Sequence, residues 1–116
     1  MKAANQGSPV REVRWIGRAA VVDAEGDIDL SRSAAFQQAL LEVLDGKPQR
    51  LVVNLAAVPY MDSSGVASLV KLLSRTRKMD LPLRLTGLCK RVRSIFEITR
   101  LDSVFEIAET EQEALS

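Results

Sequence analysis

The segment 60–66, Tyr-Met-Asp-Ser-Ser-Gly-Val, is the place in the chain where residues able to carry chemistry gather. It stands between a short apolar run and a long amphipathic segment. Asp62, Ser63 and Ser64 are all residues that cap helix starts by accepting backbone N–H groups. Gly65 lets another backbone or a ligand approach closely, because it has no side chain. The segment is therefore expected where a strand ends and a helix begins, which is where open α/β sheets place their functional sites.

Ser63 and Ser64 are the candidate reactive groups, and the composition limits what they can do. A serine hydroxyl needs a neighbouring base to act as a nucleophile, and the chain contains no His. The sequence also lacks the G-x-S-x-G elbow of many serine hydrolases and the GxxxxGK[ST] loop of nucleotide enzymes. Without His, His-ligated zinc sites are excluded as well. We therefore expect no enzyme activity, no cofactor and no metal site.

Because catalysis by these serines is not expected, the role left for this segment is to be modified by another protein. A phosphate on Ser63 adds about −1.5 to −2 charge at pH 7 and three acceptor oxygens, and it reverses the sign of a chain whose formal net charge is +1. The helix start tolerates this charge in part, whereas Asp62 repels it. The main effect is expected on a partner docked over the helix start. Taken alone, an ordinary helix cap accounts for the same residues.

The elements that must position this segment follow from the apolar periodicity of the chain. We expect a hairpin of strands 10–16 and 19–27, a helix from Ser31 or Ser33 to Gly46, a buried strand 51–55, a helix from about Ser64 to Lys78, a strand 81–86, a helix 88–99, a strand 103–107 and a short helix 109–116. The inner stripe of the helix after the motif is expected to comprise Val66, Leu69, Val70 and Leu73. The order ββαβαβαβα predicts a mixed α/β sheet with crossover helices.

Length and composition fit one domain. The chain has 116 residues, 47% of them hydrophobic, with 16 basic and 15 acidic side chains. Residues 1–9 are small, polar or Pro and are expected to form a flexible tail, with a single domain over 10–116. The near-neutral charge argues against a nucleic-acid binder. One Cys permits no internal disulfide, which indicates the cytoplasm, and no long apolar run is present, so no membrane insertion is expected.

Three stretches of the sequence carry a resemblance to a known family: 26–36 (GDIDLSRSAAF), 51–70 (LVVNLAAVPYMDSSGVASLV) and 90–107 (KRVRSIFEITRLDSVFEI). They resemble the STAS domain, and within it the bacterial anti-sigma factor antagonist (anti-anti-sigma factor) group. The resemblance spans about residues 10 to 115, and its most specific element is MDSSG after the VVNL strand. It implies the STAS (SpoIIAA-like) fold, with an N-terminal hairpin, four to five strands and about four helices.

The resemblance also implies a partner and a switch. Members of the group bind an anti-sigma factor that is also a serine kinase, and the unmodified form thereby frees a sigma factor for transcription. The phosphorylated form does not bind, and a serine phosphatase restores it. Carried over by position, the phosphoacceptor is Ser63. The residues expected to flank it are Asp62, Ser64, Gly65, Asp29 and Asn54, of which Ser64 is the expected helix cap.

Two of these flanking residues have an equal structural explanation. Asp29 matches an acidic position near the phosphorylation site, and Asn54 matches the Asn that ends the central strand. Hydrogen bonding in a turn and at a strand end explains both equally well. The expected partner contacts are Met61, Val66, Ala67 and Lys71. Where many relatives continue Ser-Gly-Leu-Gly, this chain has Val66 and Ala67 after Gly65, a change that we expect to narrow the choice of partner.

The segment 71–93 is rich in positive charge, with eight basic residues against one acid, Asp80. It predicts either a solvated helix face or a docking site for an acidic partner. No aromatic residues alternate with these charges, so nucleic acid is not expected. Two functions stay open: a binding module switched at Ser63, or an assembly subunit of a lipid-transport ABC complex or a stress-signalling scaffold. In either case we expect a monomer or a weak dimer.

Overall fold

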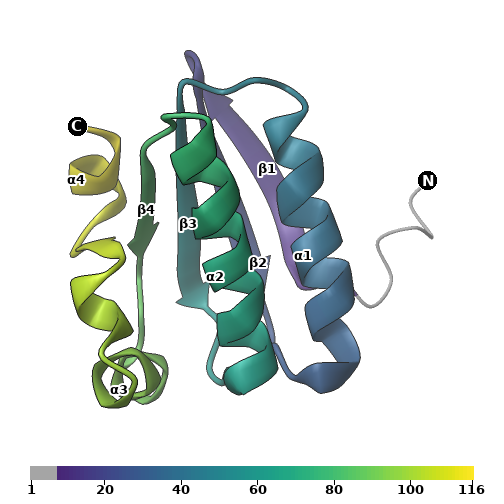
Figure 1. Ribbon diagram of the computed structural model, residues 1–116, viewed down its shortest axis with the longest axis vertical. Helices are drawn as coiled ribbons and strands as arrows, with labels where there is room; N and C mark the ends of the chain where they lie inside the picture. The colour runs from purple at the N-terminus through teal and green to yellow at the C-terminus, as the bar shows by residue number, and fades with distance from the viewer. Residues whose placement is uncertain (1–7) are drawn as a thin grey trace.

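Five strands form one sheet in the computed structural model, which describes residues 8–116 (Figure 1). The strand order β1-β2-β3-β4-β5 follows the order in the sequence. The strands are β1 (Val10–Ile16), β2 (Ala19–Glu25), β3 (Arg50–Ala57), β4 (Leu83–Thr86) and β5 (Glu106–Ala108). β1 and β2 pair antiparallel, and the other neighbours pair parallel. The predicted N-terminal hairpin and mixed sheet are thereby confirmed.

Four helices complete the order ββαβαβαβα, as predicted. They are α1 (Leu30–Leu44), α2 (Ser63–Lys78), α3 (Lys90–Ile98) and α4 (Glu111–Leu115), with a 3-10 turn at Leu101–Ser103. Several predicted boundaries differ from those in the structure, and two of the differences have a structural cause. The cap of α1 is Asp29 rather than Ser31 or Ser33. The last strand begins at Glu106 because the 3-10 turn takes up the first residues of the predicted strand.

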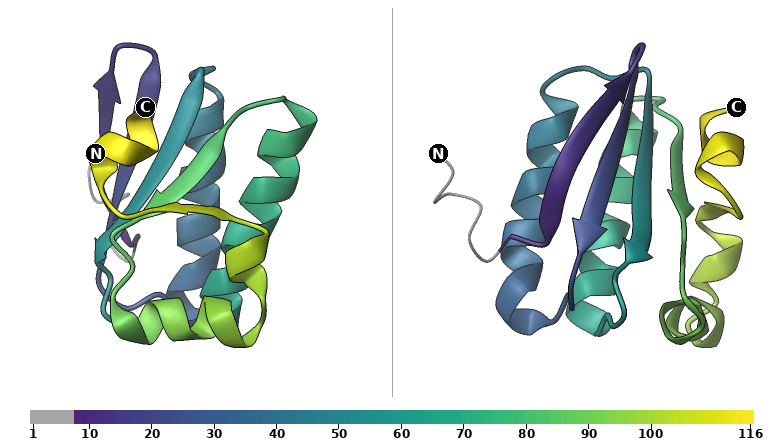
Figure 2. Two further views of the ribbon diagram at one scale, coloured as in Figure 1. Left: turned by 90° about the vertical axis from the view of Figure 1, so that its left-hand side faces the viewer. Right: turned by 180° about the vertical axis from the view of Figure 1, so that it is seen from behind.

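The helices α1 and α2 lie side by side over one face of the sheet (Figure 1). This follows from the strand order, because right-handed crossovers between successive parallel neighbours bring the connecting helices to the same face. Seen from behind, β1, β2 and β3 lie in front of α1 and α2, and α4 stands on the side of the sheet away from these helices (Figure 2). The two faces of the sheet are therefore covered very differently.

The core reflects this two-sided arrangement. Along β3, Leu51, Val53 and Leu55 belong to the large cluster that includes α1 and α2, whereas Val52 packs with Val21 and Ala114 of α4. Neighbouring residues of a strand point to opposite faces, so β3 is apolar on both. The strand 51–55 was predicted to be buried, and the structure confirms this.

The inner face of α2 differs in part from the predicted stripe. Leu69 is fully buried as predicted, and Leu72 and Thr76 are buried beside it. Val70, by contrast, is 40% exposed. The buried positions follow the helical spacing of three and four residues, which carries Val70 to the outer side. The prediction that Val70 lies on the inner stripe was wrong.

The N-terminal tail predicted over residues 1–9 falls outside the described residues except for Ser8 and Pro9. Pro9 is buried, and its carbonyl accepts the backbone N–H of Glu25 at 2.6 Å. The Ser8 hydroxyl accepts the N–H of Val10. These two residues therefore belong to the folded part of the chain. Within residues 8–116, none of the helices combines the length and the apolar character that crossing a bilayer requires.

Candidate functional site

The carboxylate of Asp62 joins the starts of two helices. Its Oδ1 accepts the backbone N–H groups of Ser64 at 2.9 Å and Gly65 at 3.2 Å, which caps α2. Its Oδ2 accepts the N–H of Leu30, the first residue of α1, at 3.1 Å. These groups are among the donors that a helix start leaves without a partner in its own helix. One side chain therefore fixes α1 and α2 relative to each other.

Hydrogen bonds also keep Asp62 ionised. The hydroxyl of Ser64 donates to its carboxylate, and this contact, followed by the backbone N–H groups of Gly65, Ser64 and Leu30, lowers the pKa of Asp62 below its usual value. Hydrogen bonds to the charged form of an acid favour that form. The start of α2 therefore carries a fixed negative charge whose oxygens are already engaged.

The backbone beneath this cap is held by a short β-bridge between Ile28 and Met61. Both side chains are fully buried. Gly65 packs directly against this bridge, since a Cβ at this position would lie 2.6 Å from Met61 Cγ and 2.9 Å from the Ile28 carbonyl oxygen. Gly65 thus allows the close approach of α2 to the chain before α1, and its role beside the phosphoacceptor remains a prediction.

The structure contradicts two of the four predicted partner contacts. Met61 is 0% exposed and Val66 is 6% exposed, because Met61 fills the core beneath Gly65 and Val66 starts the inner face of α2. Neither side chain can meet a partner from this position. Ala67 and Lys71 are exposed on α2, and their role as contacts remains a prediction.

Ser63 and Ser64 differ sharply in the state of their hydroxyl groups. Ser64 is half-buried and donates its hydroxyl to Asp62. Ser63 is exposed, and within residues 8–116 its side chain has no hydrogen-bond partner. The helix cap is Asp62, not Ser64 as predicted, and this leaves Ser63 as the first helical residue. Of the two serines, Ser63 therefore presents a hydroxyl that an incoming protein can reach.

Asp29 lies at the same edge of the sheet and caps α1. Its Oδ1 accepts the N–H of Ser31 at 3.1 Å and the hydroxyl of Ser31 at 2.7 Å. The next residue is Leu30, whose N–H reaches Asp62, so the two capping carboxylates flank the same junction. The structure thus brings Asp29 to the surroundings of the candidate phosphoacceptor, although its hydrogen bonds are those of a helix cap.

Asn54 belongs to a different part of the molecule. Its amide donates to Asp23 Oδ1 at 2.9 Å, and its side-chain oxygen accepts the N–H of Ala56 at 3.0 Å. Val53 packs on the face of the sheet that α1 and α2 cover. Asn54 is the next residue of the strand, so the Asn54 side chain points to the opposite face. The backbone of Gly87 packs closely against Asn54, because a Cβ at Gly87 would lie 2.9 Å from the side-chain oxygen of Asn54. The expectation that Asn54 flanks Ser63 was therefore wrong.

On that opposite face, Arg14 binds two carboxylates. It donates to both oxygens of Asp23, at 2.6 and 2.9 Å, and to both oxygens of Glu111 at the start of α4, at 3.0 and 2.6 Å. The Arg14 guanidinium, and then the amide of Asn54, hold the pKa of the buried Asp23 below its usual value. Sequence reasoning missed this network because Arg14 and Glu111 lie 97 positions apart.

Two large exposed side chains lie at the starts of α1 and α2, and the sequence did not predict their exposure. Leu30 is 77% exposed and Tyr60 is 37% exposed. The guanidinium carbon of Arg91, at the start of α3, lies 5.8 Å from the centre of the Tyr60 ring. No signal in the sequence identified Leu30, because an apolar residue near a helix start is expected to be buried.

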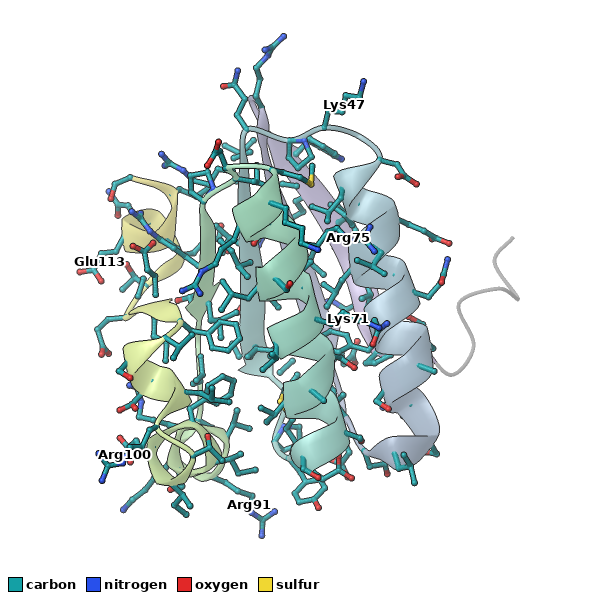
Figure 3. The ribbon with its side chains drawn as sticks, viewed as in Figure 1. Lys47, Lys71, Arg75, Arg91, Arg100 and Glu113 are labelled. Carbon is teal, nitrogen blue, oxygen red and sulfur yellow. The ribbon has the colours of Figure 1, made fainter. Side chains whose placement is uncertain are left out.

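The basic segment 71–93 does not form one patch. Lys71 and Arg75 project from α2, while Arg91 lies near the start of that helix (Figure 3). Arg84 instead binds Glu106 and the backbone carbonyls of α4, and Arg93 pairs with Glu109 at 3.7 Å. The predicted docking surface for an acidic partner is therefore divided among separate faces.

One further serine has a spacing seen in enzymes. Ser68 and Lys71 stand three residues apart, the S-x-x-K spacing in which a serine is the nucleophile. Ser68, however, is 3% exposed, and its hydroxyl donates to the carbonyls of Ser33 at 3.1 Å and Ser64 at 3.2 Å. Lys71 is exposed. This hydroxyl ties α2 to α1 and is not presented to a substrate.

Comparisons with known proteins agree with this geometry. Residues 11–114 match the STAS domain family. An anti-sigma-B factor antagonist of Staphylococcus epidermidis is 30% identical over 88 residues, which cover 76% of this chain and 82% of that protein. A crystal structure of an anti-sigma factor antagonist from Mycobacterium paratuberculosis has a TM-score of 0.79 and 26% identity over 90% of this chain and 88% of that one.

The fold is shared beyond close sequence similarity. A protein from Thermotoga maritima superposes with a TM-score of 0.85 over 90% of each chain at 16% identity. The match of the family to nearly the whole chain and the identity with the staphylococcal antagonist point the same way. The chain belongs to the STAS domain family, with anti-sigma factor antagonists among its relatives.

Proposed function

We propose that this protein is an anti-sigma factor antagonist that binds an anti-sigma factor with serine kinase activity and is switched off by phosphorylation of Ser63. The observation that carries the proposal is the contrast between two adjacent hydroxyls. Ser63 is exposed and has no hydrogen-bond partner among the described residues, whereas the Ser64 hydroxyl donates to Asp62. The anti-sigma-B factor antagonist to which the chain is similar supports the partner class.

The proposed chemistry needs no catalytic group from this chain. The Ser63 oxygen attacks the γ-phosphorus of ATP held by the partner, an O–P bond forms, and the bond to the leaving ADP breaks. The proton of the hydroxyl passes to a base of the partner. Asp62 does not serve as this base, because its oxygens already accept hydrogen bonds and its pKa is lowered. The chain is the substrate of the reaction rather than its catalyst.

The switch follows from charge. A phosphate adds about −1.5 to −2 charge to Ser63 at pH 7, directly beside the ionised Asp62. A partner surface that accommodates the neutral Ser63 hydroxyl beside the Asp62 carboxylate then faces a further charge of about −1.5 to −2 at the same place. Release of the phosphorylated form follows, and a serine phosphatase restores the binding form. The proposed setting is the cytoplasm, where sigma factors act.

Labelling with ATP tests the proposal. The full chain is incubated with radiolabelled ATP and anti-sigma serine kinases of the same organism, and the labelled residue is located by mass spectrometry. Ser63→Ala should abolish labelling, while the matched control Ser64→Ala should still be labelled. In binding experiments Ser63→Ala should keep its affinity, and Ser63→Asp should lose about tenfold, or about 1.4 kcal/mol.

Two results would contradict the proposal. If the label persists in Ser63→Ala and disappears in Ser64→Ala, the phosphoacceptor is Ser64 and not Ser63. Equal affinity of Ser63→Ala and Ser63→Asp for the partner would remove the electrostatic switch. Failure of every such kinase to label the wild-type chain would favour the alternative, an assembly subunit in which serine modification plays no part.

A further inference from the structure

The start of α3 lies against the loop that leads to Ser63. Cys89, the cap residue of α3, contacts the carbonyl oxygen of Val58 through its sulfur at 3.6 Å. Two residues further on, Arg91 covers the ring of Tyr60 at 5.8 Å. Tyr60 precedes Ser63 by three residues, and Arg91 extends from α3 to the side of the start of α2 (Figure 3). A cation of α3 therefore lies near the start of α2, where the candidate phosphoacceptor stands.

The three helix starts at this edge differ in charge. Asp29 caps α1 and Asp62 caps α2, and each places a negative charge at the positive end of a helix dipole. The start of α3 has no side-chain cap and no acidic residue in its first turn; its first two residues are Lys90 and Arg91. Cations at a helix start are unfavourable. An anion delivered next to Arg91 would relieve this repulsion.

We infer that a phosphate on Ser63 is received by Arg91, which leaves the Tyr60 ring to bind it. This inference rests on the proposed function, since it concerns the modified form of the same site. Among the charged groups at the three helix starts, Asp62 and Asp29 repel a phosphate on Ser63, and Arg91 and Lys90 attract it. The cation–π contact of an exposed Arg is weak, whereas a guanidinium binds phosphate through two parallel charge-assisted hydrogen bonds.

This exchange gives the modification two effects on the surface. The phosphate charges the start of α2, and at the same time Arg91 loses its free positive charge and uncovers the Tyr60 ring. A partner that touches both the start of α2 and Arg91 is therefore opposed at two points by one modification. Arg91 acts here as a positioning residue for the phosphate, without a part in the phosphoryl transfer.

The experiment uses phosphoserine placed at position 63 during translation, so that no kinase is needed. A ³¹P NMR titration gives the pKa of the phosphate in the otherwise wild-type chain, in Arg91→Gln and in the control Arg18→Gln. Arg18 lies in the exposed turn between β1 and β2, at the opposite end of β2 from the start of α1. Arg91→Gln should raise the phosphate pKa by about half a unit, because a nearby cation favours the dianion. Arg18→Gln should leave it unchanged.

The aromatic signals of Tyr60 give a second measurement, because the chain has one tyrosine. On phosphoserine incorporation these signals should move toward their positions in unphosphorylated Arg91→Gln, in which the ring is also uncovered. A phosphate pKa that is the same with and without Arg91 would overturn the inference, as would a pKa that responds to Lys90→Gln and not to Arg91→Gln. These results are independent of kinase labelling, so the inference and the proposed function can fail separately.

Discussion

The starts of α1 and α2 are built to the same local plan. In each, an Asp caps the helix and accepts both the N–H and the hydroxyl of a Ser two residues later, Asp29 with Ser31 and Asp62 with Ser64. The residue between Asp and Ser is exposed in both. It is Leu30 in α1 and Ser63 in α2, so one start offers an apolar side chain and the other a free hydroxyl.

The two starts differ in their tertiary connections. Asp62 also accepts the N–H of Leu30 from the other helix, whereas Asp29 accepts from Ser31 alone among the described side-chain contacts. Three residues after the cap, α1 has Arg32 and α2 has Gly65, which packs on Ile28 and Met61. A shared cap motif therefore fixes the local geometry, while the surrounding residues decide which helix start can serve as a site.

The largest expected effect on stability comes from Gly65→Ala. In an exposed helix a Gly to Ala change stabilises by about 1 kcal/mol. Here the added Cβ meets Met61 Cγ at 2.6 Å and the Ile28 carbonyl at 2.9 Å, so we expect destabilisation by about 1–3 kcal/mol. Urea denaturation measures the change. The matched control is Ala67→Gly at an exposed position of the same helix, and a more stable Gly65→Ala would show that α2 does not need this close approach.

Removing the two caps should separate their roles. Asp29→Ala removes one cap and should cost about 1 kcal/mol, whereas Asp62→Ala also frees the N–H of Leu30 and should cost about 2 kcal/mol. The free energies of unfolding of both variants give the comparison. Equal losses would mean that the link between the helices contributes nothing beyond the cap.

The pH dependence of stability should depend on the Asp62 charge. Its folded pKa is lowered, so the charge contributes stability that is complete above the unfolded value of about 3.9. This contribution is lost as the pH falls through the lower, folded pKa. Asp62→Asn keeps a capping oxygen but removes the charge. The difference in unfolding free energy between wild type and Asp62→Asn should therefore be constant near neutral pH and shrink below about pH 4. A difference that grows on acidification would reverse the assigned shift.

The smallest expected effect comes from Leu30→Ser, which makes the start of α1 match Asp-Ser-Ser. Leu30 is 77% exposed, so stability should change by less than about 0.5 kcal/mol. We expect no label at position 30 from a kinase that labels Ser63, because Arg32 occupies the place of Gly65. Labelling at both helix starts would show that the kinase reads the short motif and not its surroundings.

Much of the fold could be predicted because it rests on local periodicity. The order of the nine strands and helices in the described residues was predicted, since alternation and helical spacing depend on residues close together in the sequence. The cap of α1 was not, because Asp29, Ser31 and Ser33 are all good caps and the sequence does not rank them. The structure selects Asp29, since the N–H of Leu30 is taken by Asp62 from another helix.

The positions of the site residues that are consecutive in the chain were predicted correctly. The predictions were wrong for residues whose position depends on contacts with distant parts of the chain. Asp62, Ser63, Ser64 and Gly65 come together because they are neighbours in the chain. Asn54 was misplaced, because alternation along β3 sends its side chain to the face that Arg14 and α4 occupy. Met61 was misplaced because a residue in a loop gives no sign that a β-bridge buries it.

By itself, the sequence determined the alternation of strands and helices, the capped helix start and the absence of His, because these depend on residue type and short spacing. The tertiary structure alone decided which serine is free, which apolar side chains stay exposed and which cation reaches the site. Those outcomes depend on contacts between residues far apart in the chain, such as Asp62 with Leu30 and Tyr60 with Arg91, and no local pattern encodes them.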